Sequence, residues 1–234
     1  MPKLVSLTVS PACGACLPRG ESTARDAPAR SMPVAFDSNS SLRLFFGLKL
    51  TDEVRPQVVE LQGRLRGCGA RVKWVEPENL HFTLRFLGEM PVLMVRDLKS
   101  IGKHVAAEMH PWNLRLQGLK AFPKVDAPQT IYAGATPGAE QLTRLARKLN
   151  RALEDRAIAE PETKKFVAHC TPGRVKPGRA LAGLVAALEA EVETSLGDMT
   201  CLGFSLLASQ LTQSGPVYTQ IASFAFSPEP EKPA

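Results

Sequence analysis

The chain has 234 residues, of which 44% are hydrophobic, and its 29 Lys and Arg against 23 Asp and Glu give a net charge of +6. This length fits one domain or two small lobes around a sizeable core. No apolar run reaches the roughly 18–20 residues of a membrane-spanning helix, so we expect no membrane association. The basic excess favours an anionic partner such as RNA, and ordinary surface charge explains it equally well.

The five cysteines are scattered and odd in number: Cys13, Cys16, Cys68, Cys170 and Cys201. This pattern argues against a secreted disulfide framework and for a reducing compartment, so we expect a cytoplasmic protein. Cys13 and Cys16 form a lone CxxC with no second Cys or His pair nearby, and we interpret it as a chance pair.

The two ends differ from the middle of the chain. Residues 1–40 hold five prolines and no sustained hydrophobic period, which predicts a disordered N-terminal extension. Residues 227–234 predict a flexible tail. Between them, residues 41–226 are expected to form one domain with two lobes.

Apolar runs and period-two patterns predict strands in this domain near 42–50, 72–75, 80–87, 112–116, 130–136, 166–171, 201–211 and 217–226. Apolar residues at helical spacing predict four helices near 54–65, 94–105, 142–153 and 181–192. We expect Thr51 to cap the first helix and the regular helix to begin near Pro56. Because many strands follow each other directly, the order favours an α+β fold with antiparallel sheet and helices on one side.

A His-x-Thr sequence occurs twice, at His81–Thr83 and at His169–Thr171, 88 positions apart. Each half of the domain holds one copy, which predicts a pseudo-twofold duplication with the two strands facing each other. In a strand, the His and Thr of each copy project to the same face, roughly 6.5–7 Å apart. Phe82, Leu84 and Phe86 are then expected to point into the core.

Two imidazoles and two hydroxyls suit the hydrolysis of a phosphodiester. One neutral histidine can take a proton from water, and the other, protonated, can give one to the leaving oxygen. Threonine hydroxyls can hydrogen-bond the phosphate oxygens as negative charge develops. This chemistry needs no metal, and the spacing matches no zinc motif. A single His-x-Thr is more simply explained by a structural histidine on a strand. Because the two copies contain half of the four histidines, a structural role and a catalytic role are equally good interpretations of the pair.

Four segments carry a resemblance to a known family: "RLFFGLKL" (43–50), "KWVEPENLHFTLRFLGE" (73–89), "FVAHCTPGRVK" (166–176) and "LLASQLTQSGPVYTQIASFAF" (206–226). Residues 42–226 resemble the two-histidine (2H) phosphoesterases, and most closely the RNA 2′,3′-cyclic phosphodiesterases, first described as 2′-5′ RNA ligases. The resemblance implies a bilobal α+β fold in which two antiparallel sheets face a central basic cleft, with helices on the outside. It implies no cofactor, and opening of a terminal 2′,3′-cyclic phosphate to a 2′-phosphomonoester.

By this resemblance His81 and His169 are the catalytic residues, and Thr83, Thr171 and Arg174 bind the substrate. It favours His169 as the general base and His81 as the general acid, although the motifs themselves do not decide between them. Phe46, Phe166 and Tyr218 match recurrent aromatic positions, for which core packing is at least as good an interpretation. The chain departs from the family pattern at Ala168 and Pro172, at Gly173, which follows Pro172, and at Tyr132, where a Trp is frequent.

Pro172 cannot donate to a strand ladder, so the second strand is expected to end or bulge there and to displace Thr171 and Arg174.

Two alternatives remain open at this point. The same chemistry can act on small nucleotide cyclic phosphates of the ADP-ribose type, and a chain of this fold can bind RNA or nucleotides with little turnover. We expect a monomer whose partners are RNA ends or nucleotide cyclic phosphates. His104 and His110 are interpreted as surface residues, and the basic run Arg144, Arg147, Lys148 and Arg151 as the solvated face of the third helix, with RNA contact the lesser interpretation.

Overall fold

The computed structural model describes residues 40–178, 181–213 and 215–228. Almost all of the extension predicted at 1–40, the Cys13–Cys16 pair and most of the tail predicted at 227–234 lie outside the described residues. Ser227 is described, and its backbone N–H donates to the Met109 carbonyl at 2.9 Å. No helix in the described part of the chain is long and apolar enough to cross a membrane.

The described residues contain nine strands and four α-helices. The strands are β1 (Ser41–Lys49), β2 (Val72–Trp74), β3 (His81–Pro91), β4 (Trp112–Lys124), β5 (Ala127–Ala135), β6 (His169–Val175), β7 (Ser195–Cys201), β8 (Gly203–Leu211) and β9 (Pro216–Ala225). The helices are α1 (Arg55–Arg66), α2 (Val95–Ala107), α3 (Ala139–Glu154) and α4 (Leu181–Ala190).

All strand pairs are antiparallel, and the order across the sheet is β7-β4-β5-β6-β3-β1-β8-β9, with β2 paired to β6. Each half of this order contains four strands. The halves are joined by one residue pair, Phe82 of β3 with Cys170 of β6. The sheet is therefore two antiparallel halves that meet at the two His-x-Thr strands.

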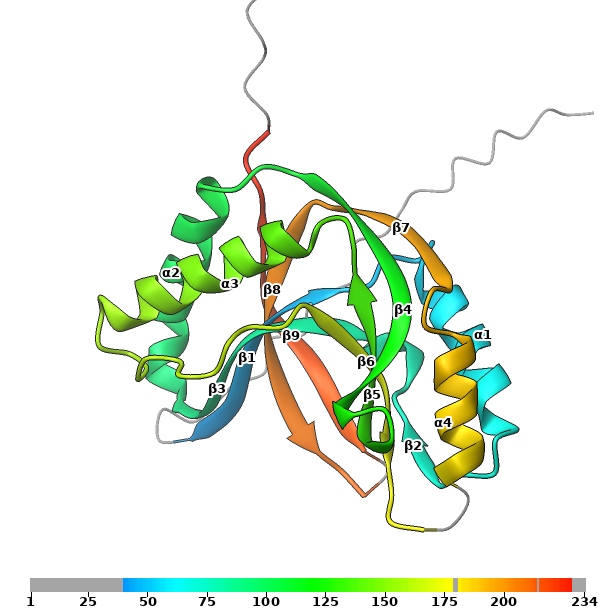
Figure 1. Ribbon diagram of the computed structural model, residues 1–234. Coiled ribbons are helices and arrows are strands. Elements are labelled where there is room, and N and C mark those ends of the chain that lie inside the picture. The colour runs from blue at the N-terminus through cyan, green and yellow to red at the C-terminus, as the bar shows by residue number, and fades with distance from the viewer. Residues whose placement is uncertain (1–39, 179–180, 214, 229–234) are drawn as a thin grey trace, which may run out of the picture. The chain divides into compact units, whose positions relative to one another are not determined.

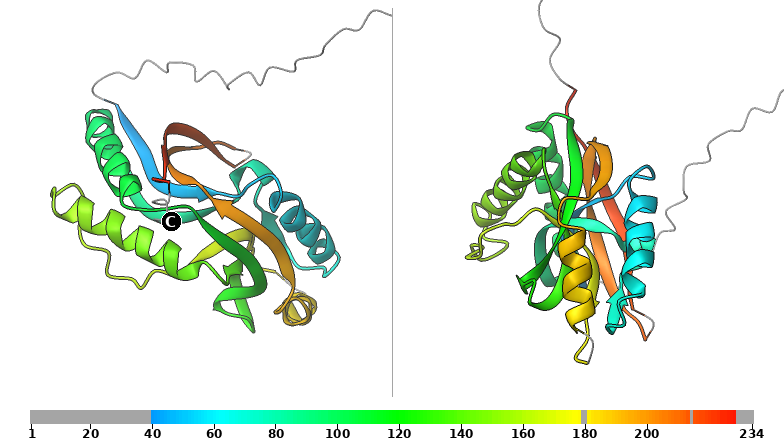
Figure 2. Two further views of the ribbon diagram at one scale, coloured as in Figure 1. Left: turned by 90° about the horizontal axis from the view of Figure 1, so that it is seen from above. Right: turned by 45° about the vertical axis from the view of Figure 1, so that its right-hand side comes forward.

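Two helices accompany each half. Helices α2 and α3 lie side by side and pack on the half that contains β3, β8 and β9, whereas α1 and α4 lie against the half that contains β4, β6 and β7 (Figure 1). The turned views show the same two helix pairs at opposite ends of the sheet (Figure 2). The predicted α+β class, the antiparallel pairing and the duplication with helices on the outside are confirmed.

Three of the four predicted helices bury the expected apolar faces. In α4, Leu184 and Leu188 are buried as expected, but Leu181 is 37% exposed, and Val192, 44% exposed, lies beyond the end of the helix at Ala190. In α3 the apolar residues at helical spacing, Leu142, Leu145, Leu149 and Leu153, are fully buried. Helix α1 begins at Arg55 with Pro56 in its first turn, as expected, but the predicted cap is wrong. The N-cap residue is Val54, and Thr51 contributes its backbone carbonyl, which accepts the N–H groups of Val54 and Arg55.

Strand β3 contains a β-bulge that overturns one prediction. Consecutive residues of β1 pair with Arg85 and Thr83, so Leu84 is an extra residue in β3. An extra residue reverses the alternation of side chains beyond it. Phe86, which we expected in the core, is therefore 46% exposed, and Arg85 is only 9% exposed in its place.

Two further strand predictions need correction. The strand predicted at 166–171 begins at His169 and continues through Pro172 to Val175. The sequence reading missed β7, whose segment "SLGDMTC" is short and interrupted by Gly197 and Asp198. Its buried residues are Leu196, Met199 and Cys201, and the register shift opposite Leu116 and Gln117 breaks the apolar alternation of the segment.

Candidate active site

The register between β3 and β6 brings the two His-x-Thr segments together. Their one Cα pair joins Phe82 to Cys170, the central residues of the two motifs. Continued by one residue in either direction, an antiparallel register sets each histidine opposite the threonine of the other motif. Directly opposite Cβ atoms lie about 5 Å apart, and diagonal neighbours about 7–8 Å apart. His81 and His169 are thus diagonal neighbours across a local twofold axis.

The central residue of each motif is anchored in the hydrophobic core. Phe82 and Cys170 are fully buried, and burial raises the pKa of the Cys170 thiol to about 12. Because neighbouring side chains of a strand alternate, burial of these two residues directs the histidines and threonines to the opposite face. The predicted placement of His and Thr on one face is therefore confirmed for both motifs.

A backbone carbonyl fixes the orientation of each imidazole. His81 Nδ1 lies 2.6 Å from the carbonyl oxygen of Asn79, and His169 Nδ1 lies 2.7 Å from that of Val167. A carbonyl oxygen only accepts, so Nδ1 carries the proton in both rings. This leaves Nε2 of each histidine as the atom that can take or give a proton.

Nε2 of His81 already has a partner in its own motif. The hydroxyl of Thr83 lies 3.0 Å from this nitrogen. Thr83 and Thr171 are both half-buried, as are the two histidines, so all four side chains retain access to solvent. The side chain of Asn79 in turn donates to the Pro216 carbonyl at 2.9 Å, which ties the orienting carbonyl of His81 to the start of β9.

Burial lowers the pKa of His81 below its ordinary value of about 6.5. The hydrogen bond from the ring to the Asn79 carbonyl opposes this shift, and the charges of His169, Lys49 and Arg174 add to it. His81 is therefore neutral at neutral pH in the free protein.

Aromatic rings flank each histidine in a matching way. The centroids of Phe45 and Tyr218 lie 5.0 and 5.3 Å from that of His81, and those of Phe122 and Tyr132 lie 5.3 and 5.7 Å from that of His169. The two rings beside His169 stack on each other at 4.3 Å. Burial raises the pKa of both tyrosines.

The sequence reading identified some of these rings and missed others. It marked Tyr218 and noted Tyr132, but it did not single out Phe45 and Phe122. Phe46, marked as a recurrent aromatic position, is fully buried and packs on Phe204 and Phe224 in the core, while Phe166 is half-buried against that core. Adjacent aromatics in an apolar strand give no local signal of which one faces the site.

Glycine makes room for the first imidazole. Gly47 of β1 pairs with Thr83, and a Cβ at this position would lie 3.3 Å from Cδ2 of His81 and 3.2 Å from Cε2 of Phe45. That is a tight approach for a side-chain atom, so any residue larger than glycine would push on both rings.

Pro172 bulges the second strand without ending it. The register between β5 and β6 slips by one residue, because Thr171 and Pro172 together lie opposite the single residue between Ile131 and Ala133. Of the two outcomes that we expected at Pro172, an end or a bulge of the strand, the bulge is confirmed. Arg174 lies beyond the bulge, is exposed, and donates from Nη1 to Thr130 Oγ1 at 3.3 Å.

A buried glutamine supports this bulge. Gln62 of α1 is 3% exposed, and its Nε2 donates to the Val75 carbonyl at 2.8 Å and to the Pro172 carbonyl at 2.9 Å. The Val75 N–H donates to the same Pro172 carbonyl at 2.9 Å. Gln62 therefore joins α1, the end of β2 and the bulge of β6. Sequence reasoning placed it on a helix only, because its partner is 110 positions away.

The other two histidines lie away from this site, as expected. His104 is exposed on α2, with Nε2 3.3 Å from Glu108, and Nδ1 of exposed His110 lies 3.1 Å from the Ser227 carbonyl. The described residues contain no group of three or more His, Cys, Asp and Glu side chains placed to hold a metal ion.

Comparisons with known proteins agree with this architecture. Residues 48–132 match the family model described as LigT like Phosphoesterase. The chain is 31% identical over 186 residues to an RNA 2′,3′-cyclic phosphodiesterase of Methanothermobacter thermautotrophicus, covering 78% of this chain and 98% of that protein. It is 34% identical over 184 residues to one of Archaeoglobus fulgidus, covering 78% and 99%.

Solved structures show the same fold. A Thermus thermophilus protein superposes with a TM-score of 0.68 at 33% identity, covering 80% of this chain and all of that one. Escherichia coli LigT complexed with 3′-AMP superposes with a TM-score of 0.63 at 21% identity, covering 80% and 99%, a likeness of fold.

We expect Gln62→Met to lower the free energy of unfolding by about 1–3 kcal/mol, because methionine fills a similar volume but removes the side-chain donor to the Val75 carbonyl and one of the two donors to the Pro172 carbonyl. Urea denaturation followed by circular dichroism measures this. Gln57→Met, an exposed position on the same helix, is the matched control and should stay within about 0.5 kcal/mol of the unchanged protein. Equal denaturation midpoints for the two variants would show that Gln62 does not support the bulge.

Proposed function

The chain belongs to the RNA 2′,3′-cyclic phosphodiesterase family of LigT like phosphoesterases, and on this premise we propose that it hydrolyses the terminal 2′,3′-cyclic phosphate of RNA to a 2′-phosphomonoester. Family membership makes it a hydrolase. The observation that supports the finer assignment is the symmetric pair of imidazoles, His81 and His169, each held by a carbonyl at Nδ1 with Nε2 left for proton transfer.

In the proposed reaction, Nε2 of His169 takes a proton from water as the water oxygen attacks phosphorus. The bond between phosphorus and the 3′ oxygen breaks, and that oxygen receives a proton from Nε2 of His81. The products are a 2′-phosphomonoester and a free 3′ hydroxyl. Each transfer is general acid or base catalysis by an imidazole.

The environment of His81 fits a general acid that becomes protonated when the substrate binds. In the free protein, burial and neighbouring positive charge keep it neutral. A phosphate anion bound between the histidines is opposite in charge to a protonated imidazole. Its binding therefore raises the pKa of His81 and favours the protonated ring. The hydroxyls of Thr83 and Thr171 donate to the non-bridging oxygens, and the Arg174 guanidinium offsets their negative charge.

Two histidines and this electrostatic support require no cofactor or metal ion, so the proposed reaction proceeds in EDTA. An oligonucleotide with a 2′,3′-cyclic phosphate, a matched mononucleotide and an ADP-ribose cyclic phosphate distinguish the substrate classes. Preference for the small nucleotides would move the assignment to a nucleotide phosphodiesterase. Binding without product would make the chain a binding module of this fold.

We expect His81→Ala and His169→Ala each to lower kcat on the cyclic-phosphate oligonucleotide by about two to four decades, the range for a lost general acid or base. Both rings face away from the core, so the variants should remain folded. His104→Ala, a substitution of an exposed histidine, is the matched control and should keep its full rate. Near-normal turnover in either motif variant would refute the two-histidine mechanism.

A substrate with a 3′ sulfur leaving group tests the two roles. A thiolate leaves far more readily than an alkoxide and needs little protonation. If His81 is the acid, this substrate should restore much of the lost rate of His81→Ala and little of that of His169→Ala, which still lacks its base. Restoration of His169→Ala alone would reverse the roles, and failure of both would leave the histidines as phosphate-binding groups.

A further inference from the structure

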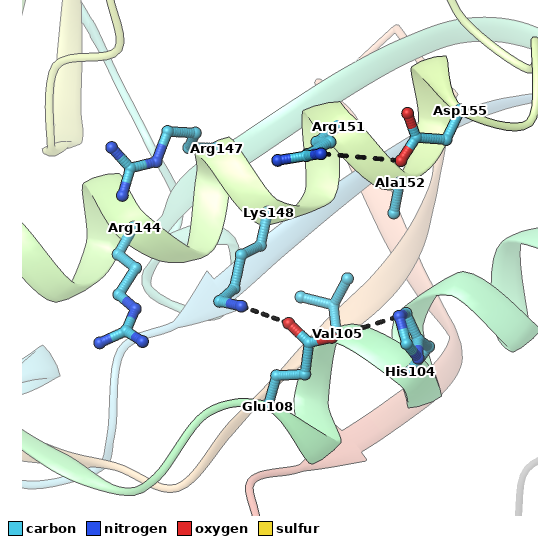
Figure 3. A pocket seen from close by; sticks show the side chains of 9 residues that line it. All are labelled: His104, Val105, Glu108, Arg144, Arg147, Lys148, Arg151, Ala152 and Asp155. Carbon is cyan, nitrogen blue, oxygen red and sulfur yellow. Dashed lines mark hydrogen bonds and ion pairs between the residues drawn. The ribbon is translucent and has the colours of Figure 1, made fainter.

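A second basic site lies between α2 and α3. The two helices border an open hollow of about 650 Å³. One face of α3 lines it with Arg144, Arg147, Lys148 and Arg151. These positions are three and four residues apart, so they project from the same side of the helix. Figure 3 shows the side chains of Arg144 and Lys148 reaching from α3 toward α2. The basic run predicted as a solvated helix face thus lines a hollow.

The charges of the hollow do not balance. Lys148 and His104 both contact Glu108, whose pKa the Lys148 ammonium holds below its ordinary value, and Arg151 lies 3.8 Å from Asp155. Four Lys and Arg side chains thus face two carboxylates, an excess of +2 among these six groups.

The excess comes from two arginines. Arg144 and Arg147 form no hydrogen bond or ion pair within the described part of the chain, although the charge of Arg144 contributes to the lowered pKa of Glu108, and both side chains are exposed. Each guanidinium presents a planar fork of donors that matches phosphate oxygens bidentately. Two such forks one helical turn apart favour a ligand that carries more than one phosphate group.

This hollow is separate from the histidine site. Helix α3 buries its leucines against the sheet and packs on β3, whose core-facing residue Phe82 points away from the face that carries His81. No residue that lines the hollow belongs to the candidate active site. A substitution here is therefore expected to leave the reaction of a mononucleotide unchanged.

We propose that the hollow between α2 and α3 is a second anion-binding site, which takes closely spaced phosphate groups through Arg144 and Arg147. The phosphates of an RNA backbone and a free polyphosphate share this chemistry. Binding at this hollow is independent of the proposed reaction, because it needs neither His81 nor His169 and breaks no bond.

The test measures binding of two probes to the full chain. One probe is a fluorescent RNA oligonucleotide that ends in a 3′ hydroxyl, followed by anisotropy over a range of salt concentrations. The other is inorganic tripolyphosphate, followed by calorimetry. The double variant R144Q/R147Q is compared with K99Q/K103Q, which removes the same charge from α2 at positions that do not line the hollow. Hydrolysis of a 2′,3′-cyclic mononucleotide, measured in parallel, reports separately on the active site.

For the oligonucleotide we expect R144Q/R147Q to weaken binding by about tenfold or more. The slope of log affinity against log salt should become shallower by about 1.4, which corresponds to two lost phosphate contacts. K99Q/K103Q should keep both values close to those of the unchanged protein. The same contrast with tripolyphosphate alone identifies a free polyphosphate as the ligand and also supports the site. Equal losses in both double variants, or binding of neither probe, would overturn it.

Discussion

The pairing of Phe82 with Cys170 is the constraint on which the rest of the site depends. It is the one residue pair between β3 and β6, and it joins two halves that are otherwise separate sets of antiparallel strands. Both side chains are buried, so the residues on either side of them must face the opposite way. Two histidines and two threonines from distant parts of the chain are thereby presented together by the central pair of the sheet.

Each of these strands bulges directly after its threonine. The extra residue is Leu84 in β3, and the register of β6 slips at Thr171–Pro172. Each bulge lies in the pairing with the outer neighbouring strand, β1 for β3 and β5 for β6, and a bulge redirects the side chains beyond it. In β6 the bulge contains a proline without an N–H group, and the Gln62 side chain and the Val75 N–H both bind its carbonyl. A departure from the family pattern is thus accommodated by neighbouring hydrogen bonds.

The period-two pattern around each motif predicted much of this site, because the side-chain face of a strand follows directly from alternation. It failed at Phe86, where the bulge reversed the alternation and exposed a residue expected in the core. Nothing local reveals such a bulge. The rings of Phe45 and Phe122 come from β1 and β4, and only the sheet order brings them to the histidines. The same applies to Gln62, whose role depends on a contact across 110 positions.

If the two half-sites act as one catalytic unit, a double-mutant cycle on kcat will show it. The measurement compares His81→Ala, His169→Ala and the double variant on one cyclic-phosphate oligonucleotide. Residues that act as a unit are strongly non-additive, since losing one already disables the other. We expect the double variant to be no more than about tenfold slower than the slower single variant. Losses that multiply would contradict it and show two independent contributions.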